Sequence, residues 1–119
     1  LVHGAGATGG ARWSEAGATL LEAPITTGQL DPEAMLTALG KAGLTRVFCE
    51  GGGALAASLL GAGLVDELVV MTAGLALGDE GQPAVGALGV SALAEAKRFQ
   101  LGETRAGGPD VLHRWVRNA

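Results

Sequence analysis

The stretch TRVFCEGGGALAASLLGAGLVDEL, residues 45–68, places a carboxylate and three glycines between an apolar run and a leucine-rich run. Residues 45–49 are β-branched and aromatic, which is typical of a buried parallel strand. Residues 54–62 carry leucines at helical spacing, and glycines follow near the end of the run, where a left-handed C-cap favours glycine. The stretch therefore predicts a strand, a glycine turn that begins after Glu50, and a helix.

A second strand is predicted directly after this helix. Residues 66–72 are apolar without strict alternation, as expected for a central strand. Because one short helical crossover connects residues 45–49 with residues 66–72, we expect the two strands to be parallel and joined right-handed. The prediction is an α/β fold with a mixed, mostly parallel sheet flanked by helices.

Another helix is predicted upstream. Asp31 suits an N-cap because its carboxylate accepts a free amide hydrogen bond, and Pro32 fits the first helical position. Gly40 or Gly43 would end this helix. The other expected segments are a flexible loop at 3–12, a strand at 18–23, a surface loop at 74–90, and an antiparallel C-terminal hairpin of 97–104 and 110–117.

Composition predicts one soluble, packed domain. The 119 residues are 48% hydrophobic and 17% charged, which argues against disorder. The formal charge is −4 and the basic residues are scattered, so we expect no nucleic-acid partner. No apolar run approaches the roughly 18 residues of a membrane helix, and no signal peptide is recognisable, so we expect a cytoplasmic protein. Cys49 is the sole cysteine, and no His/Cys cluster predicts a metal site.

Glu50 and the glycines after it have two interpretations. A strand, a glycine turn and a helix would place free amides and a positive helix end at the carboxyl edge of a parallel sheet, where anions bind. A glycine triplet also occurs in tight turns that bind nothing. Likewise, Glu50 either accepts a hydrogen bond from a neighbouring backbone amide or holds the polar hydrogens of a ligand. The position at a sheet edge favours ligand binding.

A rival motif lies near the N-terminus. Gly4, Gly6 and Gly9 follow the spacing GxGxxG, and Glu22 stands at about the distance of a ribose-binding acid. Between Gly9 and the strand expected from residue 18, too few residues remain for the helix that must carry a pyrophosphate. We therefore do not interpret this motif as a dinucleotide-binding fingerprint.

No nucleophilic or acid–base set is predicted. His3 and His113 lie far apart in the sequence, so they form no recognisable catalytic pair. Cys49 lies in an apolar run, where a small core residue is commoner than a nucleophile.

Two stretches together resemble a known family. TRVFCEGGGALAASLLGAGLVDELVV (45–70) and KRFQLGETRAGGPDVLHRWV (97–116) are similar to the C-terminal reductase domain of bifunctional riboflavin-biosynthesis deaminase/reductases, which has a dihydrofolate-reductase-like fold. The resemblance extends from about Leu30 to the end. It implies that residues 1–119 are the C-terminal half of such a domain. The chain starts at Leu1 rather than Met, and we interpret this start as a cut N-terminus.

The resemblance also implies an activity and a site. Family members use NADPH to reduce 5-amino-6-(5-phosphoribosylamino)uracil to its ribityl product, and a homodimer or higher homo-oligomer is expected. Glu50 matches an acidic residue beside substrate and nicotinamide, so it is the expected catalytic-site residue, with a binding or orienting role. The residues expected to hold the cofactor diphosphate are Gly51, Gly52, Gly53, Ala54 and Leu55. Where the family usually has a proline after the second strand, this chain has Gly74.

Two alternatives stay open. One is another dihydrofolate-reductase-like reductase that acts on a different pteridine or pyrimidine. The other is a non-catalytic half-domain that serves assembly or dimerisation, which the high apolar content and an incomplete sheet with an exposed edge would favour.

Overall fold

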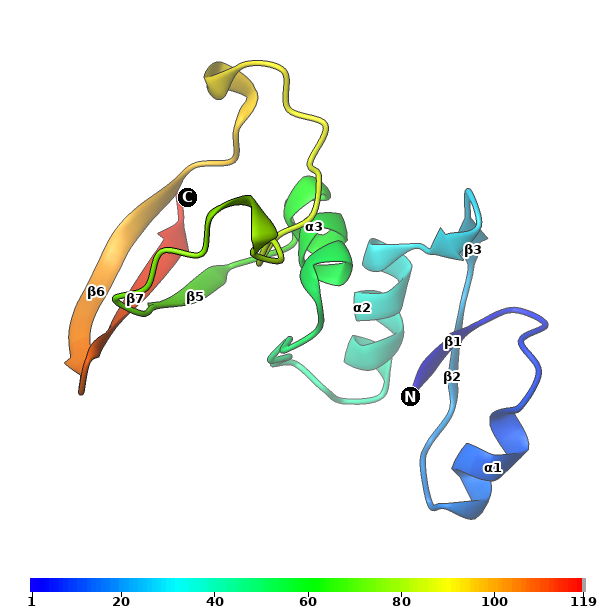
Figure 1. The fold of residues 1–119 in the computed structure, drawn as a ribbon. Coiled ribbons are helices and arrows are strands. Elements are labelled where there is room, and N and C mark those ends of the chain that lie inside the picture. Colours follow the sequence, from blue (N-terminus) through cyan, green and yellow to red (C-terminus); the bar gives the residue numbers. More distant parts are fainter. Residues whose placement is uncertain (119) are drawn as a thin grey trace. The chain divides into compact units, whose positions relative to one another are not determined.

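The chain forms two compact units. The computed structural model describes residues 1–118. The first unit spans Leu1–Glu50 and the second spans Gly51–Ala119 (Figure 1). Among the described residues, none of the helices has the length and apolar character that crossing a bilayer requires.

In the first unit, short strands alternate with helices. Its elements are β1 (Val2–Gly4), α1 (Gly10–Glu15), β2 (Leu21–Ala23), β3 (Ile25–Thr26), β4 (Gln29–Leu30) and α2 (Pro32–Lys41). β1 and β2 run parallel, with Gly4 opposite Ala23. β3 and β4 form a tight hairpin through Thr27 and Gly28, both of which have positive φ. Ala23 is buried, with 2% of its surface exposed.

A helix occupies part of the connection that the sequence predicted to be a loop. α1 begins directly after Gly9, whose φ of 89° lies in the left-handed region that glycine adopts at little cost, and Gly17 turns the chain again with a φ of 86°. The loop prediction for 3–12 was therefore wrong in part, because α1 begins at Gly10. The strand predicted at 18–23 is confirmed only over Leu21–Ala23. With 6 residues, α1 is under two turns long, so the GxGxxG spacing still lacks the longer helix of a dinucleotide-binding unit.

The helix predicted from Asp31 and Pro32 is confirmed as α2. The Asp31 side chain accepts a hydrogen bond from the Ala34 amide at 2.8 Å, and Pro32 is the first helical residue. At the other end, Gly43 has a φ of 87°, and the Leu44 amide donates to the Leu39 carbonyl, five residues earlier, at 3.0 Å. This is a Schellman motif, so Gly43 rather than Gly40 ends the helix.

Residues 44–52 have neither helical nor strand structure. The predicted strand over 45–49 was therefore wrong, and so was the interpretation of Cys49 as a core residue, because Cys49 is exposed. Val47 and Phe48 are also exposed, by 51% and 79%. A β-branched and aromatic run favours an extended backbone, but a strand exists only where a neighbouring strand supplies its hydrogen bonds. No strand within residues 1–118 is paired with this run.

In the second unit, a helix precedes an antiparallel sheet (Figure 1). Its elements are α3 (Gly53–Gly61), β5 (Glu67–Thr72), the short 3-10 helices η1 (Gly78–Glu80) and η2 (Leu93–Glu95), β6 (Phe99–Gly107) and β7 (Asp110–Arg117). β7 is the central strand, with β5 and β6 antiparallel on its two sides. The predicted C-terminal hairpin is confirmed, and its turn contains Gly108 with a φ of 66°. The long connection predicted at 74–90 is confirmed as a loop that contains η1.

The α/β class is confirmed, whereas the predominance of parallel strands was wrong. Among the described strands, β1 and β2 are the parallel pair, and the other pairings are antiparallel. The strand predicted at 66–72 forms as β5, but it does not pair in parallel with residues 45–49. The tight turn before Asp110 returns the chain beside β5 and β6, so β7 supplies the hydrogen bonds that β5 needs.

β6 carries one extra residue, Gly102. Leu101 lies opposite Trp115, and Glu103 lies opposite Arg114, so Gly102 is left unpaired. Such a β-bulge bends the strand and increases its twist. The guanidinium group of Arg114 lies between two carboxylates on the neighbouring strands. It is 3.8 Å from that of Glu103 on β6 and 3.2 Å from that of Glu67 on β5.

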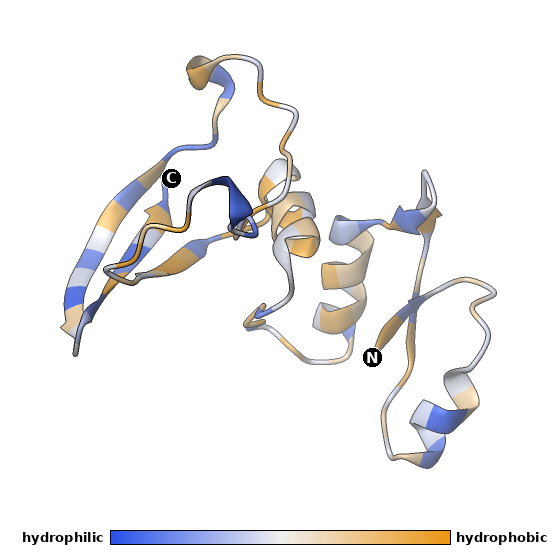
Figure 2. Cartoon of the chain, viewed as in Figure 1, coloured by the Kyte–Doolittle hydropathy of each residue, from blue (hydrophilic) through white to orange (hydrophobic). Residues whose placement is uncertain are grey.

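The apolar helix α3 supplies the buried side chains of the second unit. Ala57, Leu59 and Leu60 are 8%, 7% and 6% exposed, and Figure 2 shows apolar residues along much of the helix. α3 ends in a second Schellman motif. Gly63 has a φ of 71°, and the Leu64 amide donates to the Leu59 carbonyl at 3.0 Å. The glycine predicted at this C-cap is confirmed.

Arg117 joins the end of β7 to the turn between α3 and β5. Its Nη1 donates to the Gly63 carbonyl at 2.7 Å, and its Nη2 lies 2.7 Å from Oδ1 of Asp66. The Arg117 amide also donates to the Asp66 carbonyl at 2.8 Å. Both side chains are largely exposed, so the ion pair itself adds little stability, and the bonds to the two carbonyls fix the geometry.

The loop before β6 has one local anchor. Oε2 of Glu95 accepts hydrogen bonds from the Ser91 amide at 3.1 Å and from the Ser91 hydroxyl at 3.0 Å. These bonds favour the ionised carboxylate and lower the pKa of Glu95 below its usual value. Because the pKa of Glu95 is lowered, the stabilisation by these hydrogen bonds is fully present at a pH above the usual pKa of a glutamate. It is lost as the pH falls through the pKa that Glu95 has in the folded chain.

The cap of α2 gives a direct test of the first unit. Asp31→Ala should lower the stability of α2 by about 1 kcal/mol, because the Ala34 amide loses its acceptor. Amide hydrogen exchange in α2 measures this loss, and Asp31→Asn is the matched control, since asparagine also accepts from the amide. Equal exchange rates in the alanine variant and the wild type would contradict the capping role.

Candidate functional site

The predicted site residues are contiguous in the chain, and the structure places them at the start of α3. Gly52 is the N-cap of the helix, with φ −63° and ψ 170°. Gly53, Ala54 and Leu55 form the first turn. The five residues expected to hold a cofactor diphosphate, Gly51 to Leu55, therefore lie together at a helix N-terminus. The strand that was expected to lead into them is not formed.

Two backbone amides of this turn are free. The Gly52 carbonyl accepts from the amides of Leu55 at 3.0 Å and Ala56 at 3.1 Å. Within residues 1–118, the amides of Gly53 and Ala54 have no hydrogen-bond partner, and no side chain caps the helix. Unpaired amides at the positive end of a helix dipole favour an anionic ligand.

Gly52 and Gly53 differ in the space around them. A Cβ atom on Gly52 would meet nothing within 4 Å. A Cβ atom on Gly53 would lie 2.9 Å from the Pro83 carbonyl oxygen and 3.2 Å from the Gly86 nitrogen. Packing within the chain therefore accounts for glycine at Gly53, whereas at Gly52 the open space leaves room for a ligand to approach the backbone.

Glu50 precedes this turn, in the segment without regular structure, and it is exposed. Its carboxylate accepts no hydrogen bond from the described residues. It is therefore available to accept hydrogen bonds from the N–H or hydroxyl groups of a ligand.

Sequence reasoning missed one segment that contacts this site. Pro83–Gly86 lies against the first helical residue, and the Gly86 amide donates to the Gly53 carbonyl at 2.9 Å. The sequence predicted only a surface loop here. Two glycines that lie 33 positions apart carry no local pattern that would link them, so only the folded chain brings this contact to light.

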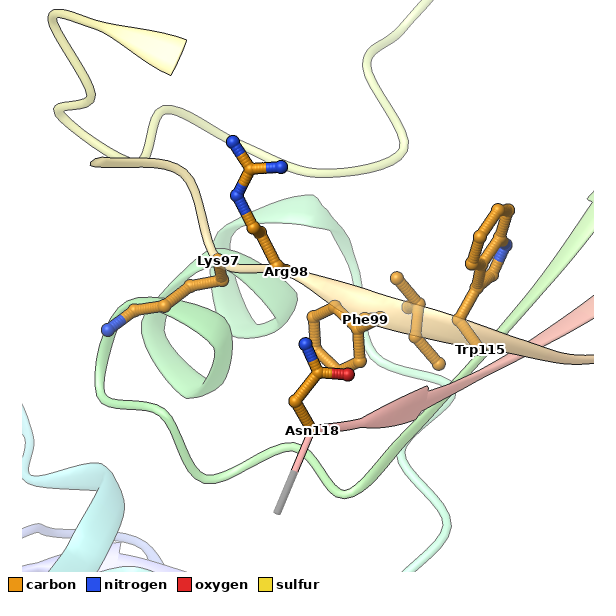
Figure 3. A pocket seen from close by; sticks show the side chains of 6 residues that line it. Lys97, Arg98, Phe99, Trp115 and Asn118 are labelled. Carbon is orange, nitrogen blue, oxygen red and sulfur yellow. The ribbon is translucent and has the colours of Figure 1, made fainter. Parts of the chain in front are cut away.

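A hollow of about 500 Å³ lies on the antiparallel sheet of the second unit. Its lining residues are Leu68, Lys97, Arg98, Phe99, Trp115 and Asn118 (Figure 3). In Figure 3 the ammonium group of Lys97 and the guanidinium group of Arg98 point in different directions. The two cations do not converge on one anion, so this hollow shows no built binding site. His113 does not line the hollow, although its ring centroid lies 6.3 Å from that of Trp115.

Comparison with known structures defines the class of the fold. The chain superposes on RibD of Acinetobacter baumannii with a TM-score of 0.73 at 22% identity. The match covers 91% of this chain and 29% of the Acinetobacter protein. It superposes with the same TM-score, 0.73, on a pyrimidine reductase-like protein from Corynebacterium diphtheriae at 18% identity. This match covers 99% of this chain and 49% of the Corynebacterium protein. The fold is that of dihydrofolate-reductase-like reductase domains.

Sequence comparison then assigns the family. The model of the RibD C-terminal domain matches residues 10–113, and the chain belongs to this family. It is 41% identical over 102 residues to the riboflavin biosynthesis protein RibD of Escherichia coli (strain K12). That match covers 85% of this chain, which spans 28% of the length of its relative. The resemblance to a C-terminal reductase domain is thus confirmed, and it begins well before the expected start at about Leu30.

The contrast between the two glycines predicts different costs of substitution. Gly53→Ala should destabilise the second unit by about 1–3 kcal/mol, because the new methyl group would press on the Pro83 carbonyl. Gly52→Ala should leave stability within about 0.5 kcal/mol, since its methyl group enters open space. Urea unfolding of both variants measures the difference. Equal destabilisation by the two substitutions would contradict the contact between Gly53 and the loop.

Proposed function

We propose that the chain is the cofactor-binding part of an NADPH-dependent reductase. The proposed reaction is the reduction of 5-amino-6-(5-phosphoribosylamino)uracil to its ribityl product in riboflavin biosynthesis. Two findings support the proposal: the chain belongs to the family of the RibD C-terminal domain, and an open, glycine-lined turn begins α3. The second is the observation that carries it, because it gives the cofactor a place to bind.

The residues of the turn fit a dinucleotide. The free amides of Gly53 and Ala54 would donate to the diphosphate oxygens, and the helix dipole would add favourable electrostatic energy. The space beside Gly52 would let the charged bridge approach the backbone closely. In this proposal Gly51 and Leu55 complete the contact surface. When bound, NADPH supplies a hydride for the sugar C1.

Glu50 is proposed to bind and orient the substrate. Its exposed carboxylate stands three residues ahead of the first helical residue, close in the chain to the amides that would hold the cofactor. A carboxylate accepts hydrogen bonds from ring N–H and hydroxyl groups, which a ribosylaminouracil carries. Such bonds would fix the sugar relative to the cofactor. Hydride transfer depends chiefly on this positioning and on exclusion of water, so the proposal requires no general acid from this chain.

The exposed strand β5 favours a second candidate function, in assembly. Val69, Val70 and Met71 are 44%, 37% and 67% exposed on an edge strand of the sheet. An apolar strand edge with free backbone groups is suited to pairing with another chain. A homodimer is compatible with the reductase proposal, whereas a purely structural module would self-associate without any stabilisation by NADPH. Thermal unfolding with and without NADPH separates these cases.

Gly52→Val should weaken NADPH binding by about tenfold or more, because its branched side chain would occupy the space proposed for the diphosphate. Isothermal titration of the purified chain with NADPH measures the dissociation constant. Gly74→Val is the matched control, since a Cβ atom at Gly74 also meets nothing within 4 Å but lies outside the turn. An unchanged affinity in the Gly52 variant would remove the glycine turn from the cofactor site.

Glu50→Gln should impair use of the substrate more than binding of the cofactor. Loss of a charge-assisted hydrogen bond to the substrate should lower kcat/KM by about tenfold or more, with the NADPH dissociation constant nearly unchanged. Steady-state kinetics with the pyrimidine substrate measure this in the intact protein. Glu15→Gln, which removes an exposed carboxylate at the end of α1, is the control. Wild-type kinetics in the Glu50 variant would exclude Glu50 from the site. Reduction of a different pyrimidine or pteridine in preference would instead support another reductase of this fold.

A further inference from the structure

The loop between β5 and β6 contacts the first turn of α3 through Pro83–Gly86. The Gly86 amide donates to the Gly53 carbonyl at 2.9 Å. A Cβ atom on Gly53 would lie 2.9 Å from the Pro83 carbonyl oxygen and 3.3 Å from that of Ala84. The loop backbone therefore lies directly against the helix backbone, with no side chain between them.

A glycine lies on each side of this contact, and both are closely packed. A Cβ atom on Gly86 would lie 3.2 Å from the Gly53 carbonyl oxygen and 3.5 Å from Cβ of Ala57. Gly86 does not have a positive φ, so its backbone conformation is open to other residues, and close packing is what restricts it. Val85, between the two contacts, is half-buried.

The contact constrains the orientation of the turn. The loop leaves no gap at Gly53: the Gly86 amide bonds to the Gly53 carbonyl, and the loop backbone packs against the Gly53 α-carbon. The amides of Gly53 and Ala54 stay free, and the space beside Gly52 stays open. One side of the turn is thus occupied by the chain, and the other is available to a ligand. A site that is already held in its binding conformation loses less entropy when the ligand binds.

We propose that Pro83–Gly86 is a positioning segment for the dinucleotide site, with Gly86 as its central residue. Its contact with Gly53 holds the first turn of α3 in the orientation that the free amides need in order to bind a diphosphate. The segment acts through the turn and touches neither the substrate nor the reacting atoms. This inference rests on the proposed function, because it assigns a role relative to the proposed cofactor.

Gly86→Ala tests the proposal in the full chain. The new methyl group would separate the loop from Gly53, so the NADPH dissociation constant should rise by about fivefold. Gly74→Ala is the matched control, because it makes the same substitution in the same loop where a Cβ atom meets nothing within 4 Å. Val85→Ala is the second variant. It loosens the same segment without adding bulk, and should weaken binding in the same direction.

A readout other than stability separates positioning from simple support of the fold. In the intact protein, Gly86→Ala should raise the KM for NADPH while kcat at saturating NADPH and the KM for the pyrimidine stay near the wild-type values. An unchanged NADPH affinity in both Gly86→Ala and Val85→Ala, whatever their melting temperatures, would overturn the positioning role and leave the proposed function intact. An equal loss in Gly74→Ala would also overturn it. If the wild-type chain binds no NADPH, the proposed function fails, and this inference fails with it.

Discussion

The second unit depends on the pairing of β7 with strands on both of its sides. Because β7 lies between β5 and β6, it supplies hydrogen-bond partners to the backbone along one edge of each, and the three strands form one sheet. Arg117, at the end of β7, then bonds to the carbonyls of Gly63 and Asp66 and so ties the turn after α3 to this sheet. The C-terminal end of α3 is held by these bonds, and its N-terminal end by the contact with Pro83–Gly86. Both ends of the helix that carries the candidate site are therefore fixed by residues far from it in sequence.

Apart from the Glu50 carboxylate, the proposed site consists almost entirely of backbone groups. In this proposal the amides would donate to the ligand, the glycines would leave space for it, and the helix dipole would favour its negative charge, so the side chains of the turn would contribute little. We expect such a site to tolerate substitution at most positions and to be sensitive at a few glycines. Gly52 and Gly53 illustrate two different reasons for the same residue type, since the first faces open space and the second faces the chain's own carbonyl groups.

Local signals in the sequence predicted the local parts of the structure. Asp31 and Pro32 gave the start of α2, Gly63 the end of α3, and the turn at Gly108 the C-terminal hairpin, because each depends on hydrogen bonds within a few residues. Residues 45–49 have the composition of a strand, but no neighbouring strand pairs with them. The composition of a segment does not show whether another strand will lie beside it. The contact between Gly53 and Gly86 was likewise invisible, since nothing near either glycine points to the other. The start of α3 was thus predictable, and what holds it in place was not.

The bulge at Gly102 has a consequence for how relatives of this chain are compared. Removal of Gly102 would leave Leu101 opposite Trp115 and Glu103 opposite Arg114, because the bulged residue pairs with nothing. A relative with one residue fewer at this position would keep every cross-strand neighbour and would expose the same side chains on the same face. A one-residue gap here in an alignment therefore marks a difference in strand curvature rather than a change in the composition of either face.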